Sequence, residues 1–259
     1  MSGVTFKDIY IDGQQWSKDS RKIIYLTPHQ PLQYASNTWI YQLMPTMTQW
    51  LKDIQFQQRL HLNQSSNHLS FYFPENESLN QQWLDIIDRH EFELGLMELY
   101  VIEGQTLMQL SINEDVYIER VTTHNIEDYL YVYDYFARPY GEEYTYESRR
   151  CVLKHFLVDK VERLIAYIKQ HPVGIVNLII TDRTVEIDGF GVLEAFRHQG
   201  VGSTLQSFIG HLADQRPVIL VADGEDTAKH MYVKQGYIFQ GYRSVSYTHL
   251  RAHETREDL

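Results

Sequence analysis

The sequence predicts an α/β protein made of two parts, and two observations carry this prediction. Short alternating apolar runs, typical of strands, are interleaved with longer segments whose apolar residues recur with the period of a helix. The pattern is interrupted at residues 103–115, where periodicity is lost and a polar cluster follows, and it restarts at residue 116. We therefore expect one domain over residues 1–113, a second over residues 114–246, and a tail over residues 247–259.

The composition is that of a globular protein. Hydrophobic residues make up 43% of the 259 residues and charged residues 22%, and no apolar run approaches the roughly 18 residues of a membrane helix. The net charge of −11 is spread over both halves, without the basic stripe that nucleic-acid binding requires. The N-terminus does not resemble a secretory signal, and the single cysteine, Cys151, excludes a disulfide framework. We expect a cytoplasmic monomer or homodimer that binds neither nucleic acid nor membrane.

The first part reads as a small α/β unit. Trp50, Leu51 and Ile54 share one side of a helix that follows Pro45. A strand at 68–73, a helix at 79–90 with Ser78 as its N-cap, and a strand at 94–102 are expected after it.

The second part alternates strands and helices more regularly. The expected strands and helices are, in turn, strands at 116–122, 161–169, 175–182, 184–193, 218–223 and 237–247, and helices at 125–159, 201–212 and 225–236. Pro139 and Gly141 divide the first helical segment in two. Turns are expected at 171–174 and at Asp182-Arg183.

A glycine loop precedes the helix at 201–212. The stretch Arg197-His198-Gln199-Gly200-Val201-Gly202 joins a strand to this amphipathic helix. A helix N-terminus with glycines around it is a ready anion site, because main-chain N–H groups are unpaired there and no Cβ keeps an anion away. The loop lacks the Lys-Ser/Thr pair of a Walker A motif and the third glycine of a dinucleotide fingerprint.

With its surroundings, this loop resembles the acyl-CoA pyrophosphate loop of the GNAT superfamily of N-acetyltransferases. A second stretch, Tyr232-Val233-Lys234-Gln235-Gly236-Tyr237, is similar to that family's Tyr-x-Lys-x-Gly-aromatic pattern. The resemblance covers roughly residues 114–246. It implies a mixed, mostly antiparallel sheet with flanking helices, whose fourth and fifth strands splay apart to admit the pantetheine arm.

The resemblance also implies acetyl-CoA as co-substrate and an amine as acceptor. The residues implied in holding acetyl-CoA are Phe190, Gly191, Val192, Arg197, His198, Gln199, Gly200, Val201, Gly202 and Ser203. Many family members have an asparagine seven residues before the tyrosine, and Glu225 stands there instead, which puts one cofactor contact in doubt.

Two residues are candidates for the chemistry. Glu186 stands where several GNAT enzymes have their general base, with Asp188 on the same strand face as a substitute. Tyr232 matches the tyrosine that often protonates the CoA sulfur in this family. The alternatives are a surface glutamate on a hairpin and a tyrosine that packs against the sheet. The histidines show no metal-binding spacing, so no metal is expected.

Two functions follow from these residues. The first is an N-acetyltransferase that acts on a primary amine of a small molecule or peptide, and the alternative is a non-catalytic module that binds CoA or a peptide. The acceptor side is expected along residues 125–158. Tyrosines and acids are frequent there, namely Tyr129, Tyr131, Tyr133, Asp134, Tyr140, Glu142, Glu143, Tyr144 and Tyr146. Such a lining suits a cationic amine, but a solvated, aromatic-flanked helix face is the preferred explanation.

The N-terminal part shares an order of elements with the C-terminal part. The strand-helix-strand order of residues 68–102 is similar to that of residues 217–247, yet residues 1–113 contain no Arg/Gln-x-x-Gly-x-Gly. We expect a degenerate GNAT-like domain that holds no CoA and frames the acceptor side; an unrelated accessory domain is the alternative.

The C-terminal stretch SYTHLRAHETREDL, residues 246–259, breaks the pattern. It resembles translated sequencing-adapter read-through, and the additional strand that a GNAT domain normally has is missing. We expect that the native chain continues differently from about Val245 and that residues 251–259 contribute nothing to fold or function. The last strand would then expose its edge.

Overall fold

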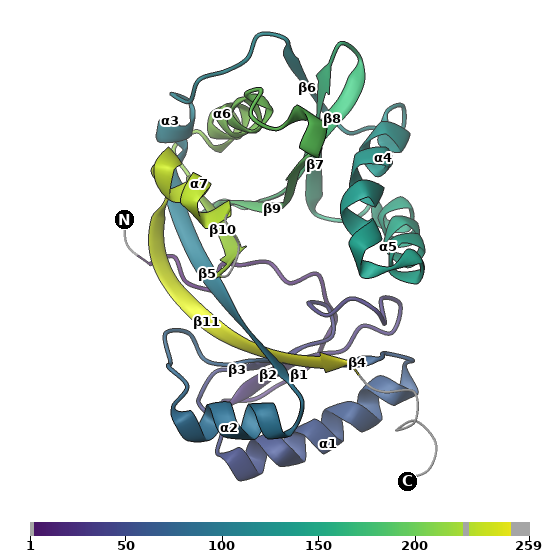
Figure 1. Ribbon diagram of the computed structural model, residues 1–259, viewed down its shortest axis with the longest axis vertical. Coiled ribbons are helices and arrows are strands. Elements are labelled where there is room, and N and C mark those ends of the chain that lie inside the picture. Colours follow the sequence, from purple (N-terminus) through teal and green to yellow (C-terminus); the bar gives the residue numbers. More distant parts are fainter. Residues whose placement is uncertain (1–2, 225–227, 250–259) are drawn as a thin grey trace. The chain divides into compact units, whose positions relative to one another are not determined.

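The computed structural model describes residues 3–224 and 228–249 (Figure 1). The chain forms two compact units. Unit 1 comprises Met1–Tyr10, Leu99–Ala222 and Thr227–Gln240, and unit 2 comprises Ile11–Glu98, Asp223–Asp226 and Gly241–Leu259. Two long strands, β5 (Glu93–Glu103) and β11 (Ile238–His249), contribute to both units.

Unit 2 is built on a sheet with the strand order β1-β2-β3-β4-β11-β5. Its elements, besides parts of β5 and β11, are β1 (Gln15–Lys18), β2 (Lys22–Tyr25), β3 (Trp39–Tyr41), α1 (Met47–Asn63), β4 (His68–Tyr72) and α2 (Gln81–Arg89). β3 and β4 are parallel, whereas β4 and β11 are antiparallel. Trp39, Trp50, Phe71 and Phe73 are fully buried and form an aromatic core between the sheet and its helices.

Unit 1 continues the strand order from β5 as β5-β10-β9-β8-β7-β6. Its other elements are α3 (Gly104–Leu107), β6 (Val116–Arg120), α4 (Ile126–Ala137), η1 (Arg138–Tyr140), α5 (Glu142–His155), β7 (Val161–Ile168), β8 (His171–Ile180), β9 (Val185–Val192), η2 (Glu194–Phe196), α6 (Val201–Ala213), β10 (Pro217–Asp223) and α7 (Ala228–Gln235). β6 to β9 pair in antiparallel fashion, and β9 and β10 are parallel.

Two apolar layers cover the sheet of unit 1. Leu205 and Ile209 of α6 pack with Val185 and Ile187 of β9 on one face. On the other face, Tyr129, Leu130 and Val132 of α4 pack with residues of β7 and β8. The predicted mixed, mostly antiparallel sheet with flanking helices is confirmed.

The order strand-helix-strand-helix-strand occurs twice along the chain. It is β3-α1-β4-α2-β5 in the first half and β9-α6-β10-α7-β11 in the second, and in each case the first two strands are parallel neighbours. The similarity in element order expected between residues 68–102 and 217–247 therefore extends one strand and one helix further toward the N-terminus.

Two local predictions were wrong, and three strands were missed. Ser78 is not the N-cap of α2, because Asn80 accepts the N–H of Trp83 with its side chain. The turn expected at 171–174 lies at Lys169 and Gln170, which both have positive φ angles and leave His171–Ile180 free to extend as a strand. Strands β1 to β3 were not predicted, because they are only three or four residues long.

The expected exposed edge of the last strand is also absent from the described residues. Val245–His249 pairs with Tyr72–His68 of β4, and Ser246 is fully buried. The boundary predicted after residue 246 falls inside β11, which runs to His249. The prediction for residues 251–259 lies outside the described residues.

Candidate functional site

The parallel strands β9 and β10 are paired only near the start of β9. Val185, Glu186 and Ile187 lie opposite Val218, Ile219 and Leu220, and the register ends there. The rest of β9, residues 188–192, therefore has main-chain groups on this side that β10 does not engage. The expected separation of these two strands is present in unit 1.

A β-bulge lies in the same part of β9. Asp188 is opposite Asn177 of β8 and Gly191 is opposite Ile175, so two residues of β9 face one residue of β8. Gly189 has a φ of +61°, a conformation that favours glycine. The bulge turns the following main chain, with Phe190 and Gly191, relative to the regular sheet.

The glycine loop leads from β9 into α6. Gly200 is the N-cap of α6 with a φ of +79° and provides no capping side chain. The first hydrogen bond of the helix runs from the Thr204 N–H to the Gly200 carbonyl, at 3.0 Å. The N–H groups of Val201, Gly202 and Ser203 are consequently left without partners within the helix, at the positive end of its dipole.

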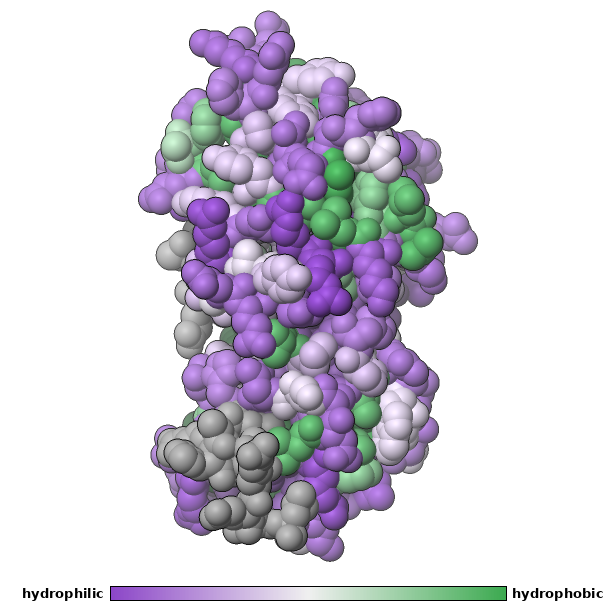
Figure 2. All heavy atoms as spheres, turned by 90° about the vertical axis from the view of Figure 1, so that its right-hand side faces the viewer, coloured by the Kyte–Doolittle hydropathy of each residue, from purple (hydrophilic) through white to green (hydrophobic). Residues whose placement is uncertain are grey.

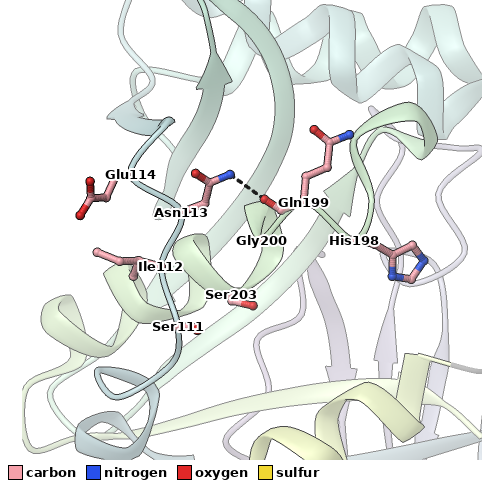
Figure 3. Close-up of a pocket in the computed structure, with 8 residues that line it drawn as sticks. All are labelled: Ser111, Ile112, Asn113, Glu114, His198, Gln199, Gly200 and Ser203. Atoms are coloured by element: carbon pink, nitrogen blue, oxygen red, sulfur yellow. Dashed lines mark hydrogen bonds between the residues drawn. The ribbon is translucent and has the colours of Figure 1, made fainter.

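A pocket of about 560 Å³ opens at this helix end (Figure 3). Its lining comes from the loop and from the segment that precedes β6, namely Ser111, Ile112, Asn113, Glu114, His198, Gln199, Gly200 and Ser203. Asn113 fixes the loop: its side-chain Nδ2 donates to the Gln199 carbonyl at 2.8 Å, and its main-chain N–H donates to Thr204 Oγ1 at 2.9 Å. Sequence reasoning missed Asn113, because residues 103–115 read as a boundary without periodicity.

The other residues expected to hold acetyl-CoA lie around this helix end. Arg197 Nε donates to the Val192 carbonyl at 3.3 Å, which ties the loop back to the end of β9. A Cβ at Gly202 would lie 3.6 Å from the Phe190 ring, whereas a Cβ at Gly191 would lie 2.4 Å from Phe136. The Val201 side chain is buried in the core, so only its main chain is available to a ligand.

This arrangement fits a diphosphate. Open N–H groups at the N-terminus of a 13-residue helix provide donors, and the absence of a capping side chain at Gly200 leaves them accessible. His198, at a φ of +61°, lies on the opposite side of the loop from Asn113 in Figure 3. Glu114 also lines the pocket and is the one acidic side chain among the lining residues.

Glu186 is buried at the start of β9, with 6% of its surface exposed. Its Oε2 accepts the main-chain N–H of Tyr10 at 2.8 Å. Burial raises the pKa of Glu186 to about 7, the Tyr10 N–H opposes this rise, and the neighbouring Asp188 carboxylate adds to it. A carboxyl group with such a pKa can accept or release a proton at neutral pH.

Tyr232 lies on α7 and packs against the core of unit 1. Its ring contacts Tyr237 edge-on, with 5.4 Å between ring centroids. Tyr237 donates to Gln206 Oε1 at 3.1 Å, and Gln206 Nε2 donates to Gln235 Oε1 at 2.9 Å, so α6 and α7 are joined by a buried polar chain. Glu225 lies outside the described residues.

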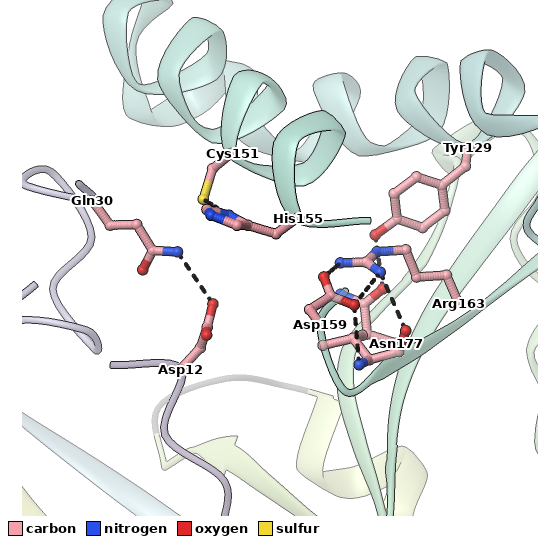
Figure 4. Close-up of polar contacts among 9 residues, drawn as sticks. Asp12, Gln30, Tyr129, Cys151, His155, Asp159, Arg163 and Asn177 are labelled. Carbon is pink, nitrogen blue, oxygen red and sulfur yellow. Dashed lines mark hydrogen bonds and ion pairs between the residues drawn. The ribbon is translucent and has the colours of Figure 1, made fainter. Parts of the chain in front are cut away.

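The tyrosines of α4, η1 and α5 differ widely in burial. Tyr129 is fully buried, donates to Asn177 Oδ1 at 2.7 Å, and has its pKa raised to about 12 by burial. Beside it, Arg163 forms a bidentate ion pair with Asp159 (Figure 4). Tyr131, Tyr140 and Tyr146 are instead more than 60% exposed.

The acidic groups on these helices are partly neutralised. Asp134 pairs with Arg149 at 2.7 Å, so it does not present a free charge to an acceptor. Figure 2 shows hydrophobic side chains gathered on the face that carries α4 and α5. Leu153 of α5, and Leu157 and Val158 just after it, are exposed apolar residues. The buried Tyr129–Asn177 hydrogen bond was missed by sequence reasoning, since its partners are far apart in the chain.

Two further observations concern metal ligands and membrane spans. No group of three or more histidine, cysteine or acidic residues is close enough to hold a metal ion in the described ranges. Among the helices of the same residues, none has the length and apolar character needed to cross a bilayer.

Known protein families match both halves of the chain. Residues 129–237 match the acetyltransferase (GNAT) family, and residues 4–100 match a domain of unknown function, DUF5613. No curated protein matches the chain.

Solved structures match the chain over most of its length. A functionally unknown conserved protein from Staphylococcus epidermidis is 55% identical, with a TM-score of 0.92 over 96% of this chain and 98% of that one. A GCN5-related N-acetyltransferase from Kribbella flavida shares the fold at 15% identity, with a TM-score of 0.63 over 93% and 91%. A tandem GNAT protein from the clavulanic acid biosynthesis pathway shares it at 7% identity, with a TM-score of 0.53 over 82% and 75%.

Proposed function

The chain belongs to the same family as the Staphylococcus epidermidis protein and carries a GNAT domain in its C-terminal half, and from this premise we propose that it is an acetyl-CoA-dependent N-acetyltransferase. The family supports an acyltransferase-type function. Our proposal adds that acetyl-CoA is the donor and that a primary amine of a small molecule or peptide is the acceptor.

One observation carries the proposal: the uncapped N-terminus of α6 beside the unpaired part of β9. A helix that begins at Gly200 without a capping side chain leaves three N–H groups open to an anion. The loss of β9–β10 pairing after Ile187 leaves main-chain groups beside the loop for an amide-containing arm. In this proposal the loop residues 197–203 hold the diphosphate and Phe190, Gly191 and Val192 contact the arm.

The proposed chemistry uses two side chains. Acetyl-CoA supplies the acyl group as a thioester. Glu186 accepts a proton from the acceptor amine, for which a pKa of about 7 is suited, and Asp188 is the substitute on the same strand face. Tyr232 supplies a proton to the departing thiolate from its position on α7.

The test of CoA binding uses Ser203, which lines the pocket in the first turn of α6. Ser203→Glu places a negative charge beside the diphosphate, while glutamate near a helix N-terminus favours the helix itself. We expect calorimetry to show CoA affinity at least about tenfold weaker, as like-charge repulsion at this range predicts.

The matched control is Ser203→Gln, which has the same size without the charge. It should weaken CoA binding much less than Ser203→Glu. Equal affinities for the two variants would contradict the assignment of the diphosphate to this helix end. Thiol release from acetyl-CoA over a panel of polyamines, aminoglycosides, amino acids and peptides then separates an enzyme from a non-catalytic CoA-binding module.

We propose further that the N-terminal half is a GNAT-like repeat that holds no CoA. The repeated element order supports this, as does the likeness to a tandem GNAT protein. The α1 helix, which corresponds to α6, begins with a capping box: Thr46 accepts the Gln49 N–H, and the Gln49 side chain accepts the Thr46 N–H. The same calorimetry should therefore give one CoA per chain, and two would contradict the proposal.

A further inference from the structure

The N-terminal segment Thr5–Tyr10 belongs to unit 1, although the chain then continues into unit 2. It is a folded segment: the Asp8 N–H donates to the Thr5 carbonyl at 3.0 Å, and the Thr5 N–H donates to Asp8 Oδ2 at 2.9 Å. Phe6 is buried, with 5% of its surface exposed. Asp8 also forms an ion pair with Arg183, at 3.3 Å, in the turn just before β9.

These anchors bring the main chain of Tyr10 to Glu186. The Tyr10 N–H donates to Oε2, and Oε1 accepts no hydrogen bond from the described part of the chain. Oε1 is therefore the oxygen left for an acceptor amine. A main-chain donor on one oxygen fixes the carboxylate in one orientation.

The other neighbours of Glu186 provide no comparable partner. Ile179 of β8 and Ile219 of β10 lie opposite it in the sheet and do not ionise. Asp188, two residues along β9, repels a negative charge at Glu186. Asp8 and Arg183 are paired with each other. The Tyr10 N–H is thus the contact that favours the ionised carboxylate.

We propose that residues 5–10 form a strap that positions Glu186 for proton transfer, with the Tyr10 main-chain N–H as the positioning group. This inference rests on the proposed function, in which Glu186 is the base. A hydrogen bond to a charged group contributes more than one between neutral groups, so its loss should shift the protonation of Glu186 measurably.

The test replaces the donor without deleting the strap. Tyr10→Pro removes the N–H group, and Tyr10→Ala retains it while removing the same side chain. The pKa of Glu186 is read by NMR in full-length protein labelled with ¹³C-glutamate, and the Glu186 signal is identified by its loss in Glu186→Gln. We expect the pKa in Tyr10→Pro to lie roughly one unit above that in Tyr10→Ala.

The pH dependence of acetyl transfer is measured on the same two variants. The acidic limb of kcat/KM should move upward in Tyr10→Pro together with the pKa of Glu186. An unchanged pKa, or a shifted pKa with an unmoved limb, would overturn the positioning role. If the wild type transfers no acetyl group to any amine, the proposed function fails, and the NMR titration still decides whether the strap controls Glu186.

Tyr10→Pro could also disturb the strap beyond the one donor. Phe6→Ser loosens the same segment from its buried anchor while leaving every N–H group in place. A rise of the Glu186 pKa in this variant as well would support the strap. A Glu186 pKa that stays at the wild-type value in both variants would exclude it.

Discussion

At the scale of single residues, Glu186 combines burial with an unusual protonation. A carboxyl group with 6% of its surface exposed loses most of its hydration, and one N–H donor does not replace it. The pKa is therefore raised to about 7 instead of being lowered as in an ion pair. Such a residue costs stability at neutral pH, which is typical of residues retained for chemistry.

This cost predicts a pH dependence of stability. The folded pKa lies above the unfolded value of 4.5, so the folded state binds more protons between these values and stability falls as pH rises through this range. Glu186→Gln, which does not ionise, should lack this fall. Relative to wild type it should gain about 2–3 kcal/mol in unfolding free energy between roughly pH 5 and pH 8.5.

Urea denaturation of the two proteins across this range is the measurement. Glu98→Gln, the same substitution at a less buried glutamate on β5, provides the control. Parallel stability curves for wild type and Glu186→Gln would mean that Glu186 titrates as an ordinary surface carboxylate.

At the scale of elements, α6 and α1, which correspond to each other in the proposed repeat, differ in how their first turns are capped. Gly200 leaves the first turn of α6 open, whereas Thr46 and Gln49 close that of α1. A few side chains at the helix start thus decide whether main-chain donors are available to a ligand.

The close approach of β9 to α4 gives a prediction at this scale. A Cβ at Gly191 would lie 2.4 Å from the Phe136 ring, so Gly191→Ala must displace this ring, α4 or the bulge. We expect a destabilisation of about 1–3 kcal/mol, as is usual for overpacking. Thermal and urea unfolding provide the measurement.

Gly202→Ala is the matched control. Its Cβ would lie 3.6 Å from the Phe190 ring, an ordinary contact, and alanine favours a helix over glycine by up to about 1 kcal/mol. This variant should be as stable as wild type or more so. Equal effects of the two substitutions would show that Phe136 does not restrict Gly191.

At the scale of the whole molecule, the two units cannot be separated by one cut in the chain. Unit 2 needs Gly241–His249, because this part of β11 pairs with β4, and unit 1 needs β5 from Leu99 onward beside β10. A fragment of residues 1–113 would lack a central strand of unit 2. Isolated fragments are therefore poor tests of what each half binds.

Two truncations follow from this. A chain that ends after Gln240 loses the β4 partner strand, with the buried Val245 and Ser246, and should aggregate or lose cooperative unfolding. A chain that ends after His249 keeps every described strand and should unfold at the temperature of the full-length protein. Calorimetric unfolding of both decides the matter, and a stable, monomeric 1–240 chain would contradict the role of β11.

The sequence by itself determined most strands and longer helices of unit 1, the glycine loop and the family. These are encoded locally: the stripe of α6, the arginine and glycines before it and the tyrosine stretch after it are each contiguous, so periodicity and spacing reveal them. Glu186 was identified by its place before this loop, and its role stays a prediction.

Only the tertiary structure decided which residues and strands that are distant in sequence lie in contact. The Tyr10 N–H donates to Glu186, which lies 176 residues away in the sequence. Asn113 fixes a loop that begins 84 residues later. Strand β11 completes a sheet that begins in the first half of the chain. A hydrogen bond from a main-chain N–H carries no side-chain signature. A strand likewise has the same pattern whichever neighbour it pairs with, so such partners depend on how the whole chain folds.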